Sequence, residues 1–374
     1  MDNYFDTFNK KDCNGCKICS LKCPKKAINM VEDEEGFLYP VIDKDKCINC
    51  NSCKRYCGNI IDKNLYDIKS YAVKNKSLNI RETSTSGGAF RLFANYIIEN
   101  GGVVYGATNV NNEVFHCKAK TKEELLQFSL SKYVRSDLKN TFDEIKELVN
   151  KQYVLFSGTP CQCNALKRYI GNNFDNLFTC EIICHSNPSK KIYEMVLKNI
   201  EKIEHKKVKK FLFRNKTDLF EGKPYCEFDD GSLKPYIEYN RAFNEMLISR
   251  PSCSKCKFSD TNRKSDITMG DFWGIDKVLP GFNDNKGVSL ITINSSKGEK
   301  IFNSIKEFID FEEVDVNDSF KYNHNINSKE NSNRSKFFNK IKTNEINENN
   351  IIEYLNKYSK ISFIKKVINK LKKI

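Results

Sequence analysis

The chain has 374 residues, of which 62 are basic, 48 are acidic and 16 are cysteines. This length allows two domains, or one large domain with a small module and a tail. The polar opening MDNYFDTFNKKD predicts no secretory leader, and no run of about eighteen apolar residues predicts a membrane span. We therefore expect a cytoplasmic protein, in which disulfides are disfavoured and many cysteines indicate metal binding or redox chemistry.

The net charge of +14 is the second feature of the composition. Such a charge is typical of proteins that bind nucleic acid or a membrane surface. Lysine, asparagine and isoleucine are abundant throughout this chain, however, and no basic run is interleaved with aromatic residues as in a nucleic-acid module. We therefore expect no nucleic-acid partner.

Residues 1–64 contain the motif Cys-x2-Cys-x2-Cys-x3-Cys twice, which is the pattern of a two-cluster ferredoxin. Three closely spaced thiolates hold one 4Fe-4S cluster there, and the fourth reaches across to the other cluster. The pattern thus predicts an inner set and an outer set of ligands. The inner set is Cys13, Cys16, Cys19 and Cys57, and the outer set is Cys47, Cys50, Cys53 and Cys23. Structural zinc is the alternative, but zinc sites usually take paired cysteines.

Two short apolar pieces, AINMV and GFLYPVI, lie between the two motifs. The acidic turn EDEEG separates them, so we expect an antiparallel hairpin and a small α+β module of the ferredoxin type. The second motif ends in Gly58 where proline is usual, and proline is not a ligand. Two adjacent clusters only conduct single electrons. We therefore expect the longer remainder of the chain to supply the chemistry at one end of this electron path.

Residues 65–312 alternate between strand and helix patterns, which predicts an α/β domain. The expected strands are 71–75, 103–110, 113–120, 151–156, 178–185 and 287–294, with a β-hairpin over 225–239 that turns at Asp230 and Gly231. The expected helices are 86–100, 121–128, 141–150, 160–170, 189–202 and 296–308.

Within this domain, Cys161 stands two residues inside an expected helix. Gly158 permits a sharp turn, Thr159 suits the N-cap and Pro160 suits the first helical position. Free backbone N–H groups and the helix dipole favour a thiolate there, which is a nucleophile or a metal ligand. A buried cysteine that packs as a small hydrophobe is the alternative.

Three further cysteines also fall at element ends. They are Cys184, at the end of an expected strand, and Cys253 and Cys256 in SCSKCKF. Together with Cys161 they form a core set, and we expect the four thiolates to share one 4Fe-4S cluster, with zinc as the alternative. The cysteines without such partners are expected to be packing residues; they are Cys117, Cys163, Cys180 and Cys226.

Five segments make the chain resemble the beta-subunit family of coenzyme F420 hydrogenase and dehydrogenase. They are STSGGAF (84–90), SKYVRSD (131–137), SGTPCQCNAL (157–166), ICHSNPS (183–189), and CSKCKF with RKSDITMGDFWG (253–274). The resemblance runs from about Tyr66 to about Phe308. It implies a flavin domain with FAD, and a core iron-sulfur cluster on Cys161, Cys184, Cys253 and Cys256. The family commonly has glycine after its Cys-His pair, whereas this chain has Ser186-Asn187-Pro188.

The resemblance also implies flavin contacts. Backbone N–H groups at a helix start would approach the flavin diphosphate, and the GDFWG turn would form a wall of the pocket. The implied cofactor-binding residues are Ser86, Gly87, Gly88, Ser131, Lys132, Tyr133, Gly270, Asp271 and Phe272, with His185 and Lys132 as candidate catalytic residues. The alternatives are a flexible helix start for the glycine pair, a core aromatic for Trp273 and a structural role for His185.

These expectations together describe an oxidoreductase. Electrons would pass between ferredoxin-type clusters, a core cluster and an FAD that exchanges hydride with an unidentified small-molecule substrate. A soluble ferredoxin or a partner redox subunit is the expected electron partner. The alternatives are an electron-transfer subunit with no substrate of its own and a zinc-bearing binding protein.

Residues 313–374 are polar and rich in asparagine and lysine. They predict a linker or loose helical appendage that leads into a basic amphipathic helix, ISFIKKVINKLKKI. Such a helix is typical of peripheral contact with an anionic membrane, and docking back on the protein is the alternative.

Overall fold

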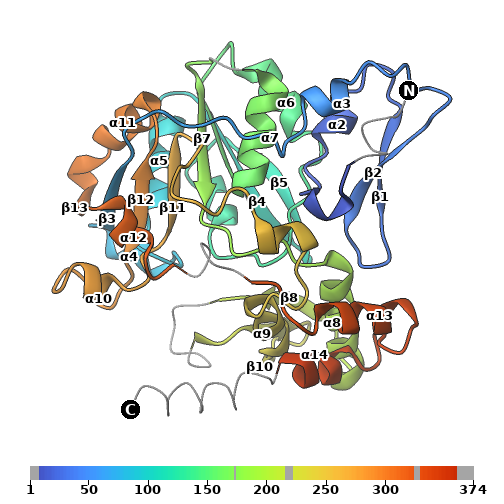
Figure 1. Cartoon of the computed structure of the whole chain (residues 1–374). Coiled ribbons are helices and arrows are strands. Elements are labelled where there is room, and N and C mark those ends of the chain that lie inside the picture. Colours follow the sequence, from blue (N-terminus) through green and yellow to red (C-terminus); the bar gives the residue numbers. More distant parts are fainter. Residues whose placement is uncertain (1–7, 172–173, 215–221, 324–328, 360–374) are drawn as a thin grey trace.

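The computed structural model describes residues 8–171, 174–214, 222–323 and 329–359. A large sheet with helices on both faces occupies the centre, and the cysteine-rich module flanks it on one side (Figure 1). A second, smaller sheet with its own helices lies against the other end of the central sheet.

The cysteine-rich module contains the predicted hairpin. Strand β1 (Ile28–Glu32) pairs antiparallel with β2 (Leu38–Ile42), which confirms that part of the prediction. The short helices α2 (Ile18–Leu21) and α3 (Ser52–Arg55) each fall inside one cysteine motif, and the single turn η1 (Lys10–Asp12) precedes the first motif. Asp33 closes the hairpin turn, because its carboxylate accepts hydrogen bonds from two backbone N–H groups of that turn.

The central sheet has eight strands in the order β13-β3-β12-β11-β7-β6-β4-β5. Four neighbours, β11, β7, β6 and β4, are parallel, and β12, β13 and β5 pair antiparallel with theirs. The α/β prediction is confirmed, and the sheet is mixed. Its strands are β3 (Lys69–Asn75), β4 (Val103–Val110), β5 (Glu113–Ala119), β6 (Val154–Gly158), β7 (Leu177–Ile182), β11 (Ile267–Asp271), β12 (Ser289–Ile293) and β13 (Ile309–Val314).

Helices cover both faces of this sheet, because neighbouring strand residues alternate between two cores. Leu155 of β6 packs with α5 (Ala89–Glu99) and α11 (Ser296–Asn303). Phe156, one residue later, packs with α6 (Thr141–Leu148) and α7 (Pro160–Ile170), together with Ile18 of the cysteine-rich module. The module is therefore seated on the α6 and α7 face. Short elements complete the domain: α4 (Leu78–Glu82), η2 (Glu124–Phe128), η4 (Pro251–Lys255), α10 (Ile275–Val278), η5 (Lys306–Phe308) and α12 (Val316–Phe320).

Two expected elements differ from those observed. The segment expected as a helix over 121–128 forms only the 3-10 turn η2. The expected hairpin forms as β9 (Tyr225–Phe228) and β10 (Leu233–Pro235), but its second strand ends at Pro235. Proline lacks a backbone N–H to continue the ladder, and α9 (Glu238–Asn244) follows.

The second sheet, in the order β10-β9-β8, forms the floor of a separate hydrophobic core. The remaining elements around this core are β8 (Val208–Leu212), α8 (Lys190–Glu204), α13 (Arg334–Lys342) and α14 (Ile351–Ser359). Buried Phe337 and Leu355 place α13 and α14 inside the core, where a linker or loose helical appendage was expected. The predicted terminal helix over 361–374 lies outside the described residues.

We expect Phe337→Ala to lower the free energy of unfolding by about 3–5 kcal/mol, because truncating a buried phenylalanine leaves a cavity. Phe337 is fully buried and contacts the rings of Phe338 and Tyr358. Urea unfolding of the two proteins measures the difference. Phe308→Ala is the control, since that ring is half exposed. Equal stability of the two variants would mean that α13 does not hold the core together.

Candidate iron-sulfur and flavin site

The inner cysteine set comes together as expected from its spacing. The Cys16 thiol interacts electrostatically with Cys13 and Cys57, and Cys19 interacts with the same three thiols. Burial raises the pKa of Cys16 to about 12, and neighbouring thiols add to the shift. A Cβ on Gly58 would lie 2.5 Å from the Cys16 sulfur, so glycine gives this sulfur its space.

The outer set lines one cavity in the module. Cys23, Cys47, Cys50 and Cys53 all border it, together with the apolar side chains of Ile28 and Ile42. Backbone N–H groups point at two of these sulfurs, from Ala27 to Cys23 at 3.2 Å and from Asn49 to Cys47 at 3.4 Å. Cys50 is exposed, so this set is the one that meets solvent.

The core set converges from three separate segments. Cys161 stands in the first turn of α7, Cys184 follows β7, Cys253 lies in η4 and Cys256 comes directly after η4. The Cys184 thiol interacts electrostatically with the other three. Thr159 forms the predicted cap of α7 through a capping box with Gln162. Its hydroxyl also lies 3.2 Å from the Cys161 sulfur.

Burial dominates the titration of three thiols of the core set, Cys184, Cys253 and Cys256. It raises the pKa of Cys184 far above the ordinary value, that of Cys253 to about 11 and that of Cys256 to about 12. Hydrogen bonds act in the opposite sense, including one from the Asn187 N–H to the Cys253 sulfur at 3.2 Å. Four such thiolates repel one another unless positive charge lies between them. The donor set therefore suits a metal cluster.

The spacing of the thiols bears on the kind of metal. Among the described residues, no three histidine, cysteine or acidic side chains lie close enough to hold a single metal ion. Zinc thiolates sit about 2.3 Å from one shared ion. The thiols within each of the three sets lie farther apart than the ligands of one shared ion would.

The inner and core sets are neighbours. Cys16 of the inner set interacts electrostatically with Cys161 of the core set. Of the remaining cysteines, Cys163, Cys180 and Cys226 are fully buried in the hydrophobic cores. Cys117 is partly buried, and its thiol donates to the Gln127 side chain at 3.2 Å.

The predicted flavin residues at 86–88 lie where β3 and β12 meet. The Gly87 N–H donates to the Ser289 hydroxyl at 2.9 Å, and the Ser86 hydroxyl donates to the Val288 carbonyl at 2.9 Å. A Cβ on Gly87 would overlap the neighbouring strand backbones, so tight packing accounts for this glycine. Gly88 is the N-cap of α5 with a φ of 79°. Contact of this segment with a flavin diphosphate stays a prediction.

Lys132 is held by backbone oxygens. Its ammonium donates to the carbonyls of Ser129 at 2.7 Å and Gln127 at 3.2 Å. Burial lowers the pKa of Lys132 to about 7, and repulsion from Lys210 adds to the shift. A lysine that titrates near neutrality can exchange protons, which suits the predicted catalytic role. Ser131, beside it, is half-buried.

Tyr133 and Asp271 are joined by a residue that sequence reasoning missed. Arg214 forms an ion pair with Asp271 and interacts with Tyr133. Its guanidinium also lies over the Trp273 ring, 5.8 Å from the ring centre. Trp273 is 47% exposed, so the alternative of a core aromatic is wrong.

The other residues of the GDFWG turn have packing roles. A Cβ on Gly270 would press against the Ile183 side chain at 2.9 Å, so glycine permits close approach of β11 to the segment after β7. Phe272 is buried in a small core with Ile275 and Phe320. These contacts fix the turn that carries Asp271 and Trp273.

His185 lies beside Phe243, with its ring 5.0 Å from the phenylalanine ring. Its Nε2 is 3.2 Å from the Phe243 carbonyl and 3.1 Å from the Asn244 carbonyl. The ring of Tyr133 stacks on that of Phe243, with 4.7 Å between the ring centres. The structure thus connects His185 to Tyr133 through one aromatic ring.

These residues share one edge of the central sheet. Strands β3, β11, β7 and β6 run in the same direction, because β3 and β11 both oppose β12. The segments that follow their carboxyl ends carry Ser86, Asp271, Cys184 and Cys161. In open α/β sheets, ligands bind at this edge.

A buried hydrogen-bond chain leads to Cys161 and was not predicted. The His116 Nδ1 lies 2.8 Å from the Ser136 hydroxyl, which accepts from the Gln162 amide at 3.1 Å. Gln162 in turn accepts from the Thr159 N–H at 3.0 Å. The histidine could not be distinguished in sequence from any other strand residue, because its partners lie on distant segments.

His116 predicts a specific dependence of stability on pH. Burial lowers its pKa to about 4, so the unfolded chain takes up the proton first as the pH falls below about 6.5. We expect this group to reduce the free energy of unfolding by about 2 kcal/mol between pH 7.5 and pH 5. Urea unfolding at both pH values should show that His116→Gln loses this component. Exposed His205→Gln should retain it, and identical behaviour of the two variants would contradict the assignment.

No helix in the described part of the chain is long and apolar enough to cross a bilayer.

A comparison with curated proteins finds no match. Among solved structures, a chain of the F420-reducing NiFe hydrogenase complex from Methanosarcina barkeri is similar at 18% identity with a TM-score of 0.47. The similarity covers 72% of this chain and 90% of that chain. Residues 151–319 match the family model that describes the C terminus of the coenzyme F420 hydrogenase/dehydrogenase beta subunit. Over these residues, the chain is similar to the coenzyme F420 hydrogenase/dehydrogenase beta-subunit family.

Proposed function

We propose that the protein is an iron-sulfur flavoprotein oxidoreductase. It would exchange electrons between an external redox partner and a small-molecule substrate. Similarity to this family supports the broader role of electron transfer or oxidoreduction. The observation that carries the proposal is the convergence of the Cys184 thiol with Cys161, Cys253 and Cys256 from three segments of the chain.

The donor chemistry fits three 4Fe-4S clusters. Each set offers four thiols, and a cluster of four iron atoms spreads its thiolates more widely than a single ion does. When bound, such clusters carry single electrons, whereas FAD accepts or releases electrons in pairs. The adjacency of Cys16 and Cys161 supports a continuous path from the module into the core.

The chain's own residues would bind and insulate these groups. Two isoleucines border the outer set, and the core thiols are partly buried, which limits the access of water to the core metal site. Thr159 and the Asn187 N–H aim hydrogen-bonding groups at sulfurs of the core set, which orients those ligands. The exposure of Cys50 favours the outer set as the place where a ferredoxin or a partner redox subunit meets this chain.

A flavin would bind at the carboxyl edge of the sheet. Arg214 offers positive charge beside Tyr133 and Asp271, and the exposed Trp273 ring offers a stacking surface. Lys132, whose pKa lies near 7, would hold or release a proton at its Nζ. A coenzyme F420 substrate is one member of the class of hydride acceptors that this site would serve.

Anaerobic purification followed by reductive titration tests the proposal. Flavin bands and cluster bands that both bleach would support it. Cluster bands without flavin would favour an electron-transfer subunit, for which the exposed outer set is the supporting observation. A colourless protein that contains zinc would overturn both.

A further inference from the structure

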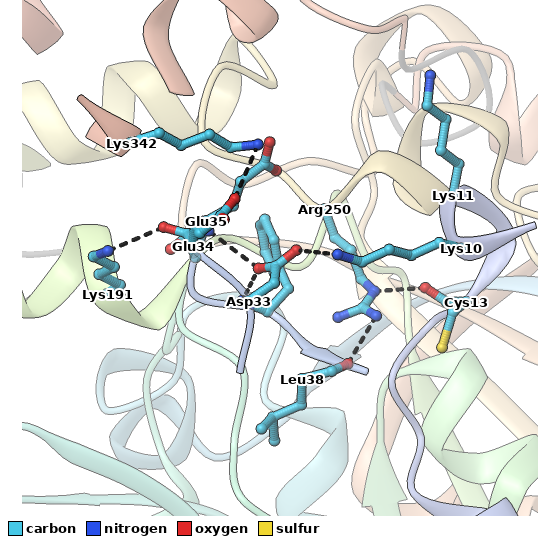
Figure 2. A network of polar contacts seen from close by, with 12 residues as sticks. Lys10, Lys11, Cys13, Asp33, Glu34, Glu35, Leu38, Lys191, Arg250 and Lys342 are labelled. Atoms are coloured by element: carbon cyan, nitrogen blue, oxygen red, sulfur yellow. Dashed lines mark hydrogen bonds and ion pairs between the residues drawn. The ribbon is translucent and has the colours of Figure 1, made fainter. Parts of the chain in front are cut away.

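Two arginines lie between the inner cysteine set and the core set. The side chain of Arg250 is only 2% exposed. Its Nε donates to the Cys13 carbonyl at 2.5 Å and its Nη2 to the Leu38 carbonyl at 2.9 Å (Figure 2). The backbone of Arg250 leads directly into the core set, since its carbonyl accepts from the Cys253 N–H at 3.0 Å.

Arg135 makes the parallel connection from another segment. Its Nη2 donates to the Gly15 carbonyl at 3.0 Å, inside the first cysteine motif. With the Asn187 amide turned so that both of its polar atoms find partners, the side-chain oxygen accepts from the Arg135 Nη1 at 3.0 Å. Asn187 also accepts from the Arg250 N–H at 2.8 Å and donates its own N–H to the Cys253 sulfur at 3.2 Å. One residue thus ties both arginines to a core thiol.

The charges of these arginines are not balanced by carboxylates. A buried cation is costly unless an anion lies nearby. Within the described ranges, neither Arg135 nor Arg250 forms an ion pair with an acidic side chain. Arg334, which is buried in the same region, does pair with Glu35. The nearby acidic side chains of the hairpin turn pair with lysines instead: Asp33 pairs with Lys10, and Glu34 pairs with Lys342 (Figure 2).

We propose that Arg135 and Arg250 form a cationic bridge between the inner and core cysteine sets. This bridge rests on the proposed function, because it supplies countercharge to two anionic clusters. Both arginines already interact electrostatically with Cys253 in the sense that favours its thiolate. Hydrogen bonds to the Cys13 and Gly15 carbonyls fix the inner loop against the core, so the bridge also sets the separation of the two clusters.

The bridge has a consequence for reduction. One added electron makes a cluster more negative without forming or breaking a bond. A fixed positive charge beside it stabilises the reduced state and raises the reduction potential. Neither arginine lines the cavity of the outer set, so the potential of a cluster there should not respond.

Redox titration of the full chain, reconstituted with iron and sulfide and reduced stepwise with dithionite, tests the bridge. In Arg250→Gln and Arg135→Gln, the inner and core potentials should become more negative by a roughly tenfold change in the reduction equilibrium, or about 59 mV for one electron. Arg250→Lys keeps the positive charge but loses the guanidinium that donates to both the Cys13 and the Leu38 carbonyl. Its potentials should stay close to the wild-type values, while the magnetic coupling between reduced clusters changes. Arg334→Gln is the matched control and should shift neither potential.

The outcomes separate this inference from the proposed function. If Arg250→Gln does not fold, the half-buried Arg135→Gln decides the matter. Cluster-loaded variants with unchanged inner and core potentials, or an equal shift in Arg334→Gln, would overturn the bridge and leave the clusters in place. Wild-type protein that takes up no iron-sulfur cluster would instead overturn the proposed function.

Discussion

Replacing Cys253 with serine is expected to lower the iron content from about twelve to about eight atoms per chain. The inner and outer sets each have four cysteines of their own, whereas the core set loses one of its four thiols. The clusters of the inner and outer sets should therefore remain. Electrons should still enter the module but stall before the flavin, although direct chemical reduction of the flavin should remain. Iron and sulfide analysis after anaerobic reconstitution measures the change.

Cys117→Ser is the matched control for this experiment. Its thiol bonds to Gln127 and lies outside the three sets, so its iron content should equal that of the wild type. If the wild-type chain holds only about eight irons and Cys253→Ser changes nothing, Cys161 is a packing thiol. The core set would then have no metal function.

Replacing Trp273 with alanine is expected to weaken FAD binding about ten- to a hundredfold. A stacked aromatic partner of a planar heterocycle contributes about 1–3 kcal/mol. The Trp273 ring is exposed beside Arg214, so its removal leaves no cavity in the core. The folded state should therefore retain its stability while the flavin is lost. Flavin fluorescence after dilution of the reconstituted protein measures the affinity.

Leu126→Ala is the control for the flavin experiment, because Leu126 is comparably exposed but lies in η2. It should keep its flavin. A Trp273→Ala protein that retains wild-type affinity would remove the GDFWG turn from the cofactor site. The residues at 86–88 and at 131–133 would then have to account for binding on their own.

Local patterns predicted the parts of the structure that depend on local physics. The cysteine spacing fixes which thiols of the module can reach one another, and the electrostatic contacts of Cys16 and Cys19 agree with it. The cap at Thr159 and the hairpin between the motifs follow from neighbouring residues in the same way. For the core set, the position of each cysteine at an element end was the available clue.

The features that escaped prediction depend on partners far away in the chain. Helices α13 and α14 have polar outer faces rich in asparagine and lysine, and only their packing shows that Phe337 and Leu355 face a core. Likewise, an arginine at 250 is unremarked in sequence until its carbonyl partners at Cys13 and Leu38 are known. Residue type alone does not reveal a non-local contact.

The acidic hairpin turn of the module has a consequence for biosynthesis. Glu35 pairs with Arg334, and the neighbouring Phe37 ring contacts that of Phe338 at 6.1 Å. The module is synthesised early, but these partners leave the ribosome some 300 residues later. Domains generally fold in order of synthesis, and contacts between distant segments form late. The contacts of the hairpin turn with α13 can therefore form only after nearly the whole chain has been synthesised, whereas the packing of Ile18 against α7 can form earlier.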